Sequence, residues 1–177
     1  FVDMGSGDDA VSYSGTDVSS VIDLGSGDDY AGFTQNGTGT INGISGENFI
    51  QNIGAGAAFI NGGSGRDRLI GNTSSDQIRG NAGDDDIDGP ASLIDAGSGN
   101  DQINFAIENQ VGNTTVTAGS GNDFLNISGR AGNDNITITN NGGTITSSFD
   151  GQDVIATGLE NLYIDGRSGA DTFNVDD

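Results

Sequence analysis

Residues 62–88 read GGSGRDRLI GNTSSDQIR GNAGDDDID, which is three blocks of nine residues laid end to end. The first block has the form G-G-x-G-x-D-x-U-x, where U is a large apolar residue. Position six is an aspartate in every block, and position eight is a leucine or an isoleucine. Tandem repetition at a short fixed period is typical of a solenoid, in which each repeat buries its apolar residue against its neighbours. The stretch therefore predicts a coiled β repeat.

The composition of the chain agrees with a thin solenoid core. Apolar residues make up 32% of the 177 residues, against roughly 45–50% in ordinary globular domains, and there are 32 glycines but one proline. One or two aliphatic residues per turn are enough to fill a solenoid. We expect residues 1–177 to form one solenoid domain, with its best-formed repeats at 62–137 and degenerate coils at 1–61 and 138–177.

The charge of the chain limits its partners. Five arginines stand against 26 acidic residues, so the net charge is −21, and most of the acids occupy fixed places in the blocks. Such a chain repels phosphate, which excludes nucleic acid as a partner and favours a cation. Histidine and cysteine are absent, which removes zinc and thiol chemistry. No apolar run is long enough to span a membrane.

The position-six residue marks the blocks along the whole chain. It falls at Asp9, Asp29, Asn48, Asp67, Asp76, Asp85, Asp101, Asp123, Asp134, Asp153 and Asp171. Most gaps are near 18–20 residues, or two blocks, which predicts coils of strand, turn, strand and turn, about nine to ten in all. The gap of 11 before Asp134 is half a coil. It predicts that Asp134, Asp153 and Asp171 lie on the opposite edge from the series that ends at Asp123.

Glycine and aspartate in these places favour calcium. Glycine at positions one, two and four permits positive φ angles, so that the turn curls and its carbonyl oxygens point inward. Calcium takes six to eight oxygen ligands, and flexible carbonyls with a few carboxylates suit it. One turn offers about half that number, so we expect two stacked turns to share each ion and binding to drive folding. The alternative is that the aspartates only cap their turns through Asx hydrogen bonds.

The blocks resemble the calcium-binding β-roll of the RTX (repeats-in-toxin, haemolysin-type) family, strongly in residues 62–88 and 96–137 and loosely elsewhere. The resemblance implies an all-β, right-handed parallel β-roll or β-helix with several calcium ions in its turns. It implies that Asp67 and Asp85 are the best carboxylate ligands. The carbonyls that it adds are those of Gly62, Ser64, Arg66, Gly80, Ala82 and Asp84. Asn48 departs from the pattern, because it keeps an oxygen but loses the charge, so we expect a weaker site there.

The resemblance also implies a function. We expect an interior segment of an extracellular or cell-surface bacterial protein that folds on binding calcium. It would serve in a surface layer, a filament or an adhesin stalk, with self-association through the solenoid ends. The alternative is the C-terminal β-roll of a secreted protease or lipase whose catalytic domain lies outside these residues.

We expect no enzymatic activity in the segment itself, because the aspartates are accounted for by metal and no histidine is present. Hydrolysis by a carboxylate pair, as in pectin-degrading β-helices, stays open as an alternative. Asp84, Asp86, Asp88 and Asp95 match the spacing of an EF-hand loop. Pro90 and the glycine-rich flanks predict no helix on either side, which argues against that motif.

Overall fold

The computed structural model describes residues 1–15 and 19–176. Within these ranges the chain is nearly all β, and its one helical element is the short 3-10 helix η1 (Ile107–Asn109). None of the described residues belongs to a helix long and apolar enough to cross a membrane. Residues 84–95 form two strands and a turn, so the EF-hand alternative has no flanking helices.

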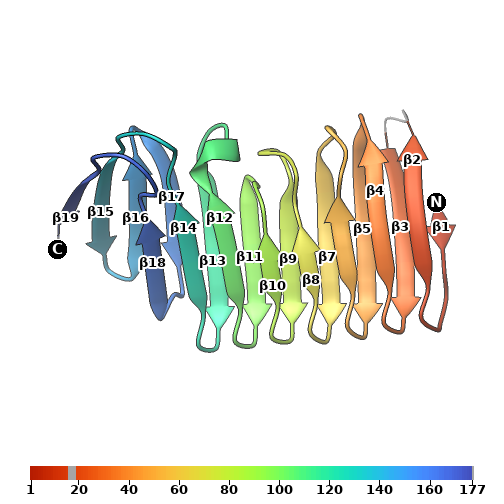
Figure 1. The fold of residues 1–177 in the computed structure, drawn as a ribbon. Coiled ribbons are helices and arrows are strands. Elements are labelled where there is room, and N and C mark those ends of the chain that lie inside the picture. The colour runs from red at the N-terminus through yellow and green to blue at the C-terminus, as the bar shows by residue number, and fades with distance from the viewer. Residues whose placement is uncertain (16–18, 177) are drawn as a thin grey trace.

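The strands form two sheets that face each other along the length of the molecule (Figure 1). In spatial order, the eight-stranded sheet contains β18 (Asn161–Asp165), β14 (Phe124–Ser128), β12 (Gln102–Ala106), β10 (Asp86–Asp88), β8 (Arg68–Ile70), β6 (Phe49–Asn52), β4 (Tyr30–Gln35) and β2 (Ala10–Gly15). The eleven-stranded sheet contains β1 (Val2–Asp3), β3 (Ser19–Ser26), β5 (Thr38–Ser45), β7 (Ala58–Ser64), β9 (Gln77–Ala82), β11 (Leu93–Ser98), β13 (Thr114–Ser120), β17 (Gln152–Thr157), β16 (Thr144–Phe149), β15 (Asn135–Asn141) and β19 (Thr172–Asp176).

Successive strands from β2 to β14 alternate between the two sheets, and each pairs in parallel with the strand one coil away. The fold is therefore the β-solenoid that the nine-residue blocks predict. The strand pairs from β2–β3 to β12–β13 make complete coils, and the solenoid has about six turns. The prediction of nine to ten coils was too high, because it assumed that every part of the chain adds to the stack.

The C-terminal part does not continue the simple coil. β15, β16 and β17 form an antiparallel meander within the eleven-stranded sheet, and β17 then returns beside β13. The two hairpin loops are Gly142-Gly143 and Asp150-Gly151, and all four residues have positive φ angles, as tight two-residue hairpins require. Three consecutive strands thus lie in the same sheet, so this part of the chain adds fewer coils than its length suggests. The sheet is also not wholly parallel, contrary to what was expected.

The core consists of two facing columns of aliphatic side chains. The column on the eleven-stranded sheet contains Ile22, Ile41, Ile60, Ile78 and Ile94. The column on the other sheet contains the position-eight residues Ile50, Leu69, Ile87, Ile103 and Leu125. All of these side chains are at most 1% exposed. One aliphatic residue per block thus provides the repeating part of the core, and further buried residues such as Leu24, Phe33 and Phe105 complete it.

The position-four glycines make the close stacking of the turns sterically feasible. Gly83 has a φ of +128°, and a Cβ added there would lie 1.7 Å from the carbonyl oxygen of Gly65 in the preceding coil. Gly7 has a similar φ of +115°, but a Cβ at that position would meet nothing within 4 Å. The two glycines share the same conformational requirement and differ only in the neighbouring coil.

This difference predicts unequal effects of the same substitution. Gly7→Ala should lower the free energy of unfolding by about 1–2 kcal/mol, because only the positive φ is strained. Gly83→Ala should cost roughly 3 kcal/mol or more, because it adds a clash with a backbone that has no room to move. Thermal or urea unfolding in one buffer measures both, and equal losses would show that stacking does not demand the glycine.

Candidate metal centre

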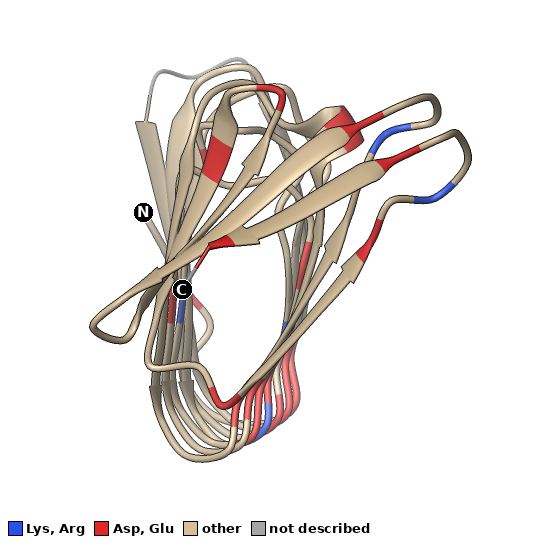
Figure 2. Ribbon diagram, turned by 90° about the vertical axis from the view of Figure 1, so that its left-hand side faces the viewer, with Lys and Arg blue, Asp and Glu red and all other residues tan. Residues whose placement is uncertain are grey.

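Seven turns of similar form connect the eleven-stranded sheet to the eight-stranded sheet, and all lie along one edge of the solenoid, here called the acidic edge. They span residues 4–9, 24–29, 43–48, 62–67, 80–85, 96–101 and 118–123. Figure 2 shows acidic residues gathered along this edge, at the bottom of the view. The position-six residues of these turns stack one per coil. This position-six column contains Asp9, Asp29, Asn48, Asp67, Asp85, Asp101 and Asp123.

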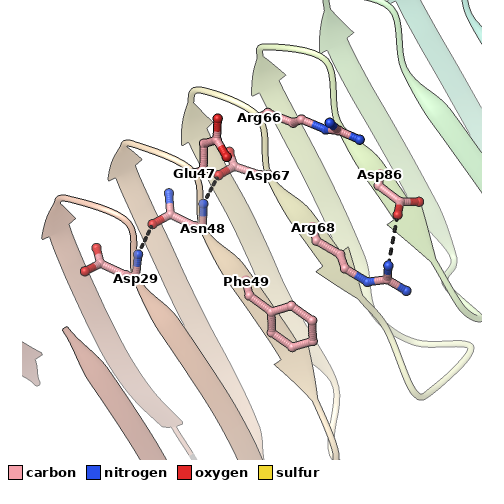
Figure 3. A pocket seen from close by; sticks show the side chains of 8 residues that line it. All are labelled: Asp29, Glu47, Asn48, Phe49, Arg66, Asp67, Arg68 and Asp86. Carbon is pink, nitrogen blue, oxygen red and sulfur yellow. Dashed lines mark hydrogen bonds and ion pairs between the residues drawn. The ribbon is translucent and has the colours of Figure 1, made fainter. Parts of the chain in front are cut away.

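A ladder of hydrogen bonds holds the column together. The backbone N–H of each member donates to the side-chain Oδ1 of the member in the next coil, as from Asp67 to Asp85 (2.8 Å) and from Asp85 to Asp101 (2.9 Å). Figure 3 shows two of these bonds, from Asp29 to Asn48 and from Asn48 to Asp67. Each side chain is therefore fixed by the backbone of the coil before it.

The second carboxylate oxygen of the aspartates in the column, Oδ2, is buried and has no hydrogen-bond partner among the described residues. This holds for Asp9, Asp29, Asp67, Asp85, Asp101 and Asp123. Apart from Asp9, these residues are at most 2% exposed. Burying an ionised carboxylate without a partner costs several kcal/mol, so the folded chain requires cations or protons at these oxygens.

Backbone carbonyls share the space beside these unpaired oxygens. A Cβ added at Gly80 would lie 2.2 Å from Asp85 Oδ2 and 2.3 Å from the carbonyl oxygen of Ala96 in the next coil. At Gly62 the corresponding distances are 2.4 Å to Asp67 Oδ2 and 2.9 Å to the Gly80 carbonyl oxygen. A carboxylate oxygen and a carbonyl oxygen thus border the same small space. Both are hydrogen-bond acceptors, so neither can donate a hydrogen bond to the other.

Asn48 shows what such a space accepts. Its Oδ1 accepts from the Asp29 N–H at 3.2 Å, so the hydrogen-bond network assigns the amide nitrogen to the side of the turn where the aspartates have Oδ2. There Nδ2 donates to the carbonyls of Gly62 (3.3 Å) and Gly46 (3.4 Å). In the aspartate coils the corresponding atoms are all acceptors. Asn48 thus brings a hydrogen-bond donor, with its partial positive charge, to the carbonyls of its turn. The described turns of the acidic edge with aspartate at position six have no such donor.

The donor set that the turns offer fits a hard cation bound by oxygen. No three acidic side chains of the described residues come together closely enough to hold a metal ion by themselves. Carbonyls would therefore supply much of the coordination shell, as calcium permits. Of the carbonyls implied by the resemblance, those of Ser64 and Ala82 accept from Gly46 N–H and Gly65 N–H, both at 2.9 Å, and keep one lone pair. An open hollow of about 310 Å³ beside Asn48 and Asp67 leads to this edge (Figure 3).

Burial and mutual repulsion disturb the acidity of the column. Burial raises the pKa of Asp85 from 3.8 to about 7, against hydrogen bonding from Asp67 N–H, and the charges of Asp67 and Asp101 raise it further. Burial likewise raises the pKa of both Asp67 and Asp101 to about 6. Without a cation, these three carboxyls thus hold protons well above the pH at which a free aspartate releases them.

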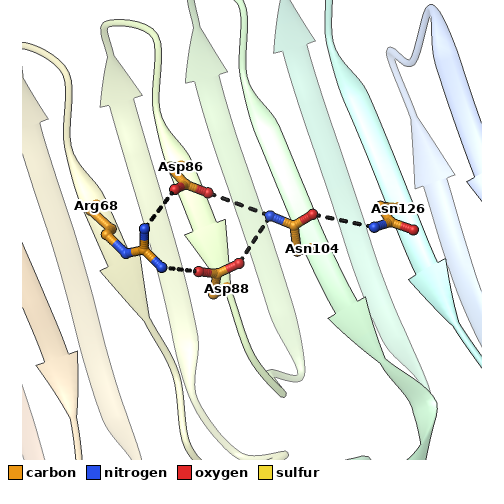
Figure 4. Close-up of polar contacts among 5 residues, drawn as sticks. All are labelled: Arg68, Asp86, Asp88, Asn104 and Asn126. Atoms are coloured by element: carbon orange, nitrogen blue, oxygen red, sulfur yellow. Dashed lines mark hydrogen bonds and ion pairs between the residues drawn. The ribbon is translucent and has the colours of Figure 1, made fainter.

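One group of acidic residues outside the column is paired with an arginine. Arg68 forms ion pairs with Asp86 (3.2 Å) and Asp88 (2.8 Å) on the outer face of the eight-stranded sheet. Asn104 donates to both carboxylates, and Asn126 donates to Asn104 (Figure 4). Burial raises the pKa of Asp86, which Asp88 raises further and Arg68 lowers. This network contains its own cation, unlike the column.

Asp76, a predicted ligand, lies on the opposite edge and has a different environment. Both of its oxygens accept hydrogen bonds, from the side chains of Asn52 and Thr73 and from the backbone N–H groups of Ala58, Asn72 and Thr73. A fully satisfied carboxylate in a turn matches the Asx-capping alternative that the sequence left open. Asp76 therefore joins its own turn to the preceding coil through hydrogen bonds.

The predicted change of edge is confirmed for Asp134 and Asp171. Their turns connect β14 to β15 and β18 to β19, and Asp134 N–H donates to Asp171 Oδ1 at 2.9 Å. Asp134 Oδ2, however, accepts from the Arg130 backbone N–H (2.8 Å), and Arg130 Nη1 lies 3.8 Å from Asp134 Oδ1. Asp153 lies in β17, beyond a hairpin, and not in a glycine turn of this kind. The gap from Asp134 to Asp153 is 19 residues, the length of one coil, and such a gap cannot distinguish a coil from an antiparallel meander.

Glu160 is a member of the site that sequence reasoning missed. It follows Gly158 in the short turn before β18, and its Oε2 accepts from Asp123 N–H at 2.9 Å. The longer glutamate side chain reaches the place that an aspartate fills in the six-residue turns. The position-six ladder thus runs from Asp9 to Glu160. An acid two residues after a glycine and directly before a strand was the available signal.

Comparison with protein-family models, with curated proteins and with solved structures finds no match to this chain.

Proposed function

We propose that the acidic edge binds several calcium ions and that the domain is a calcium-dependent structural repeat. The observation that carries the proposal is the set of six buried, unpaired Oδ2 atoms, of which those of Asp67 and Asp85 share their space with backbone carbonyls. Asp29, Asp67, Asp85, Asp101 and Asp123 with the turn carbonyls would hold the ions, and Asp9 would do so at the first turn. When bound, calcium supplies the positive charge that these oxygens lack.

Calcium fits this site better than other common cations. The site offers oxygen ligands alone, which does not favour zinc or copper. Magnesium requires a near-ideal octahedron and retains several waters, whereas these oxygens are buried against the turn. Calcium tolerates irregular shells of carbonyls and carboxylates. The preference for calcium therefore follows from two properties of the site: its ligands are all oxygens, and they are buried away from water.

The proposed role of binding is to switch the chain between an open and a folded state. Repulsion along the column opposes stacking of the turns when no cation is present, and each ion removes the repulsion for two neighbouring coils. Extracellular modules bind calcium at roughly 10⁻⁴–10⁻³ M, so such a chain would stay open inside a cell and fold outside it. We propose an extracellular bacterial location and a structural role in a surface layer, a filament or an adhesin stalk.

Direct calcium titration tests the proposal. Isothermal titration and native mass spectrometry should find several calcium ions per chain and much weaker binding of magnesium. Asp85→Asn should lose an ion or weaken binding about tenfold or more, a typical effect of disturbing a metal shell. Asp95→Asn removes the same charge from the outer face of β11 and should bind as the parent does. Absence of calcium binding, or equal binding by the two variants, would reject the proposal.

A further inference from the structure

Asn48 occupies one step of the column without needing an ion. Its backbone N–H donates to Asp67 Oδ1 at 2.7 Å and its Oδ1 accepts from Asp29, so it keeps both contacts of the ladder. Its Nδ2 then satisfies the carbonyls of Gly46 and Gly62. Unlike its aspartate counterparts, Asn48 leaves no side-chain atom buried without a partner.

The charges around Asn48 also differ from those in the rest of the acidic edge. The turns at 43–48 and 62–67 together carry Glu47, Arg66 and Asp67, a net charge of −1, whereas the first two turns carry four aspartates. Arg66 has no ion-pair partner within 4 Å among the described residues, and it borders the hollow beside Asn48 and Asp67. Arg66 also borders a hollow with Asp84 and Asp85, and its charge lowers the pKa of Asp86, so its guanidinium lies toward the following coil (Figure 3). The lower attraction of this step for a metal ion therefore comes from the small net charge of the two turns taken together.

The position of Asn48 separates the aspartates of the column into two groups. Asp9 and Asp29 precede it, and Asp67, Asp85, Asp101 and Asp123 follow it. Asp29 and Asp67 are two coils apart, roughly 9.6 Å at the usual strand spacing, and a neutral side chain lies between them. Adjacent aspartates are half as far apart, so charge coupling is strong within each group and weak between them.

From this arrangement we infer that Asn48 divides the column into two calcium-binding segments that act independently, separated by a step that holds no ion. The inference rests on the proposed calcium binding and adds a residue that determines where the ions go. Asn48→Asp should restore the unpaired oxygen beside the Gly46 and Gly62 carbonyls. It should create one further calcium site and join the two segments.

The number of ions tests the first part of this inference. Native mass spectrometry in excess calcium should find one more ion per chain in Asn48→Asp than in the parent. Asn122→Asp adds the same charge at position five of the acidic edge, where Asp8 and Asp28 already show that an aspartate is accommodated, and it should leave the number unchanged. An unchanged count in Asn48→Asp, or an equal gain in Asn122→Asp, overturns the inference.

The coupling between segments tests the second part. Calcium titration followed by circular dichroism should contain a transition that Asp101→Asn removes. Asp29→Asn should shift the midpoint of that transition less than about twofold in the parent, and about fivefold or more in Asn48→Asp, the lower bound of usual coupling between sites. A large shift in the parent overturns the inference. Failure of the parent to bind calcium at all rejects instead the proposed function.

Discussion

In a chelator at about pH 8, the chain is expected to give the circular dichroism spectrum of an open coil, and millimolar calcium to convert it to β structure. The reason is linkage: at one to ten times its dissociation constant, an ion that binds only the folded state adds about 0.4–1.4 kcal/mol, and the contributions of several ions add together. Several ions should together raise the midpoint of thermal unfolding by on the order of 20 °C or more. This is the largest effect that the structure predicts.

Two controls make the result specific to the column. Magnesium at the same concentration changes ionic strength equally but should stabilise the fold far less, because the buried oxygens do not accept a hydrated ion. Asp95→Asn should respond to calcium as the parent does, because its carboxylate lies on the outer face of a sheet. Identical melting curves in calcium and in chelator would show that calcium does not stabilise this fold.

In the absence of metal, the stability of the chain is expected to fall as pH rises, which is unusual for an acidic protein. The pKa of Asp85 is raised from 3.8 to about 7, and those of Asp67 and Asp101 to about 6. A raised pKa means that the folded state binds protons more tightly than the unfolded state. Its contribution is complete below about pH 3.8 and is lost as pH rises through about 6 to 7.

The change should amount to a few kcal/mol in total, on the order of 1.4 kcal/mol for each pKa unit that the folded state sustains. Circular dichroism in chelator between about pH 5 and pH 8 follows it as a loss of β structure with rising pH. Calcium should reverse the slope, because the bound ion competes with protons for the same oxygens. A chain that is more stable at pH 8 than at pH 5 without metal would contradict the pKa directions.

Asp85→Asn provides the matched variant for this experiment. We expect its amide to repeat the bonds of Asn48 and to donate to the carbonyls of Gly83 and Ala96. In chelator at about pH 8 it should therefore be more stable than the parent by about 1–3 kcal/mol, the cost of one unsatisfied buried group. In calcium the order should reverse. If Asp85→Asn is less stable than the parent in both conditions, Asp85 Oδ2 is not an unsatisfied acceptor in the folded chain.

The nine-residue blocks were sufficient to predict the solenoid and the edge on which most of the position-six aspartates lie. Gly83 and Ile87 explain why, because the close contact between turns demands glycine and each strand must bury one aliphatic side chain. Such local requirements repeat with the sequence. The change of edge at Asp134 was equally readable, since half a coil of sequence is half a turn in space.

The hairpin and the hydrogen bonds were not readable in the same way. Gly142-Gly143 and Asp150-Gly151 are hairpin signals, but in a chain rich in glycine turns they look like further coil turns. Asp76 and Asp85 hold the same position in their blocks, yet donors surround only the first. That difference depends on which edge the turn occupies and on what lies one coil away, which a single block does not contain.

The ladder in the column has a direction with consequences for assembly. Every amide of the column donates toward the C-terminus, so a coil obtains its acceptor from the coil that follows it, up to Glu160. The amide that follows each member donates the other way, as from Tyr30 N–H to the Asp9 carbonyl oxygen. The two ends of the column therefore differ in chemistry: an added coil must offer a side-chain acceptor at the C-terminal end and an N–H donor at the N-terminal end.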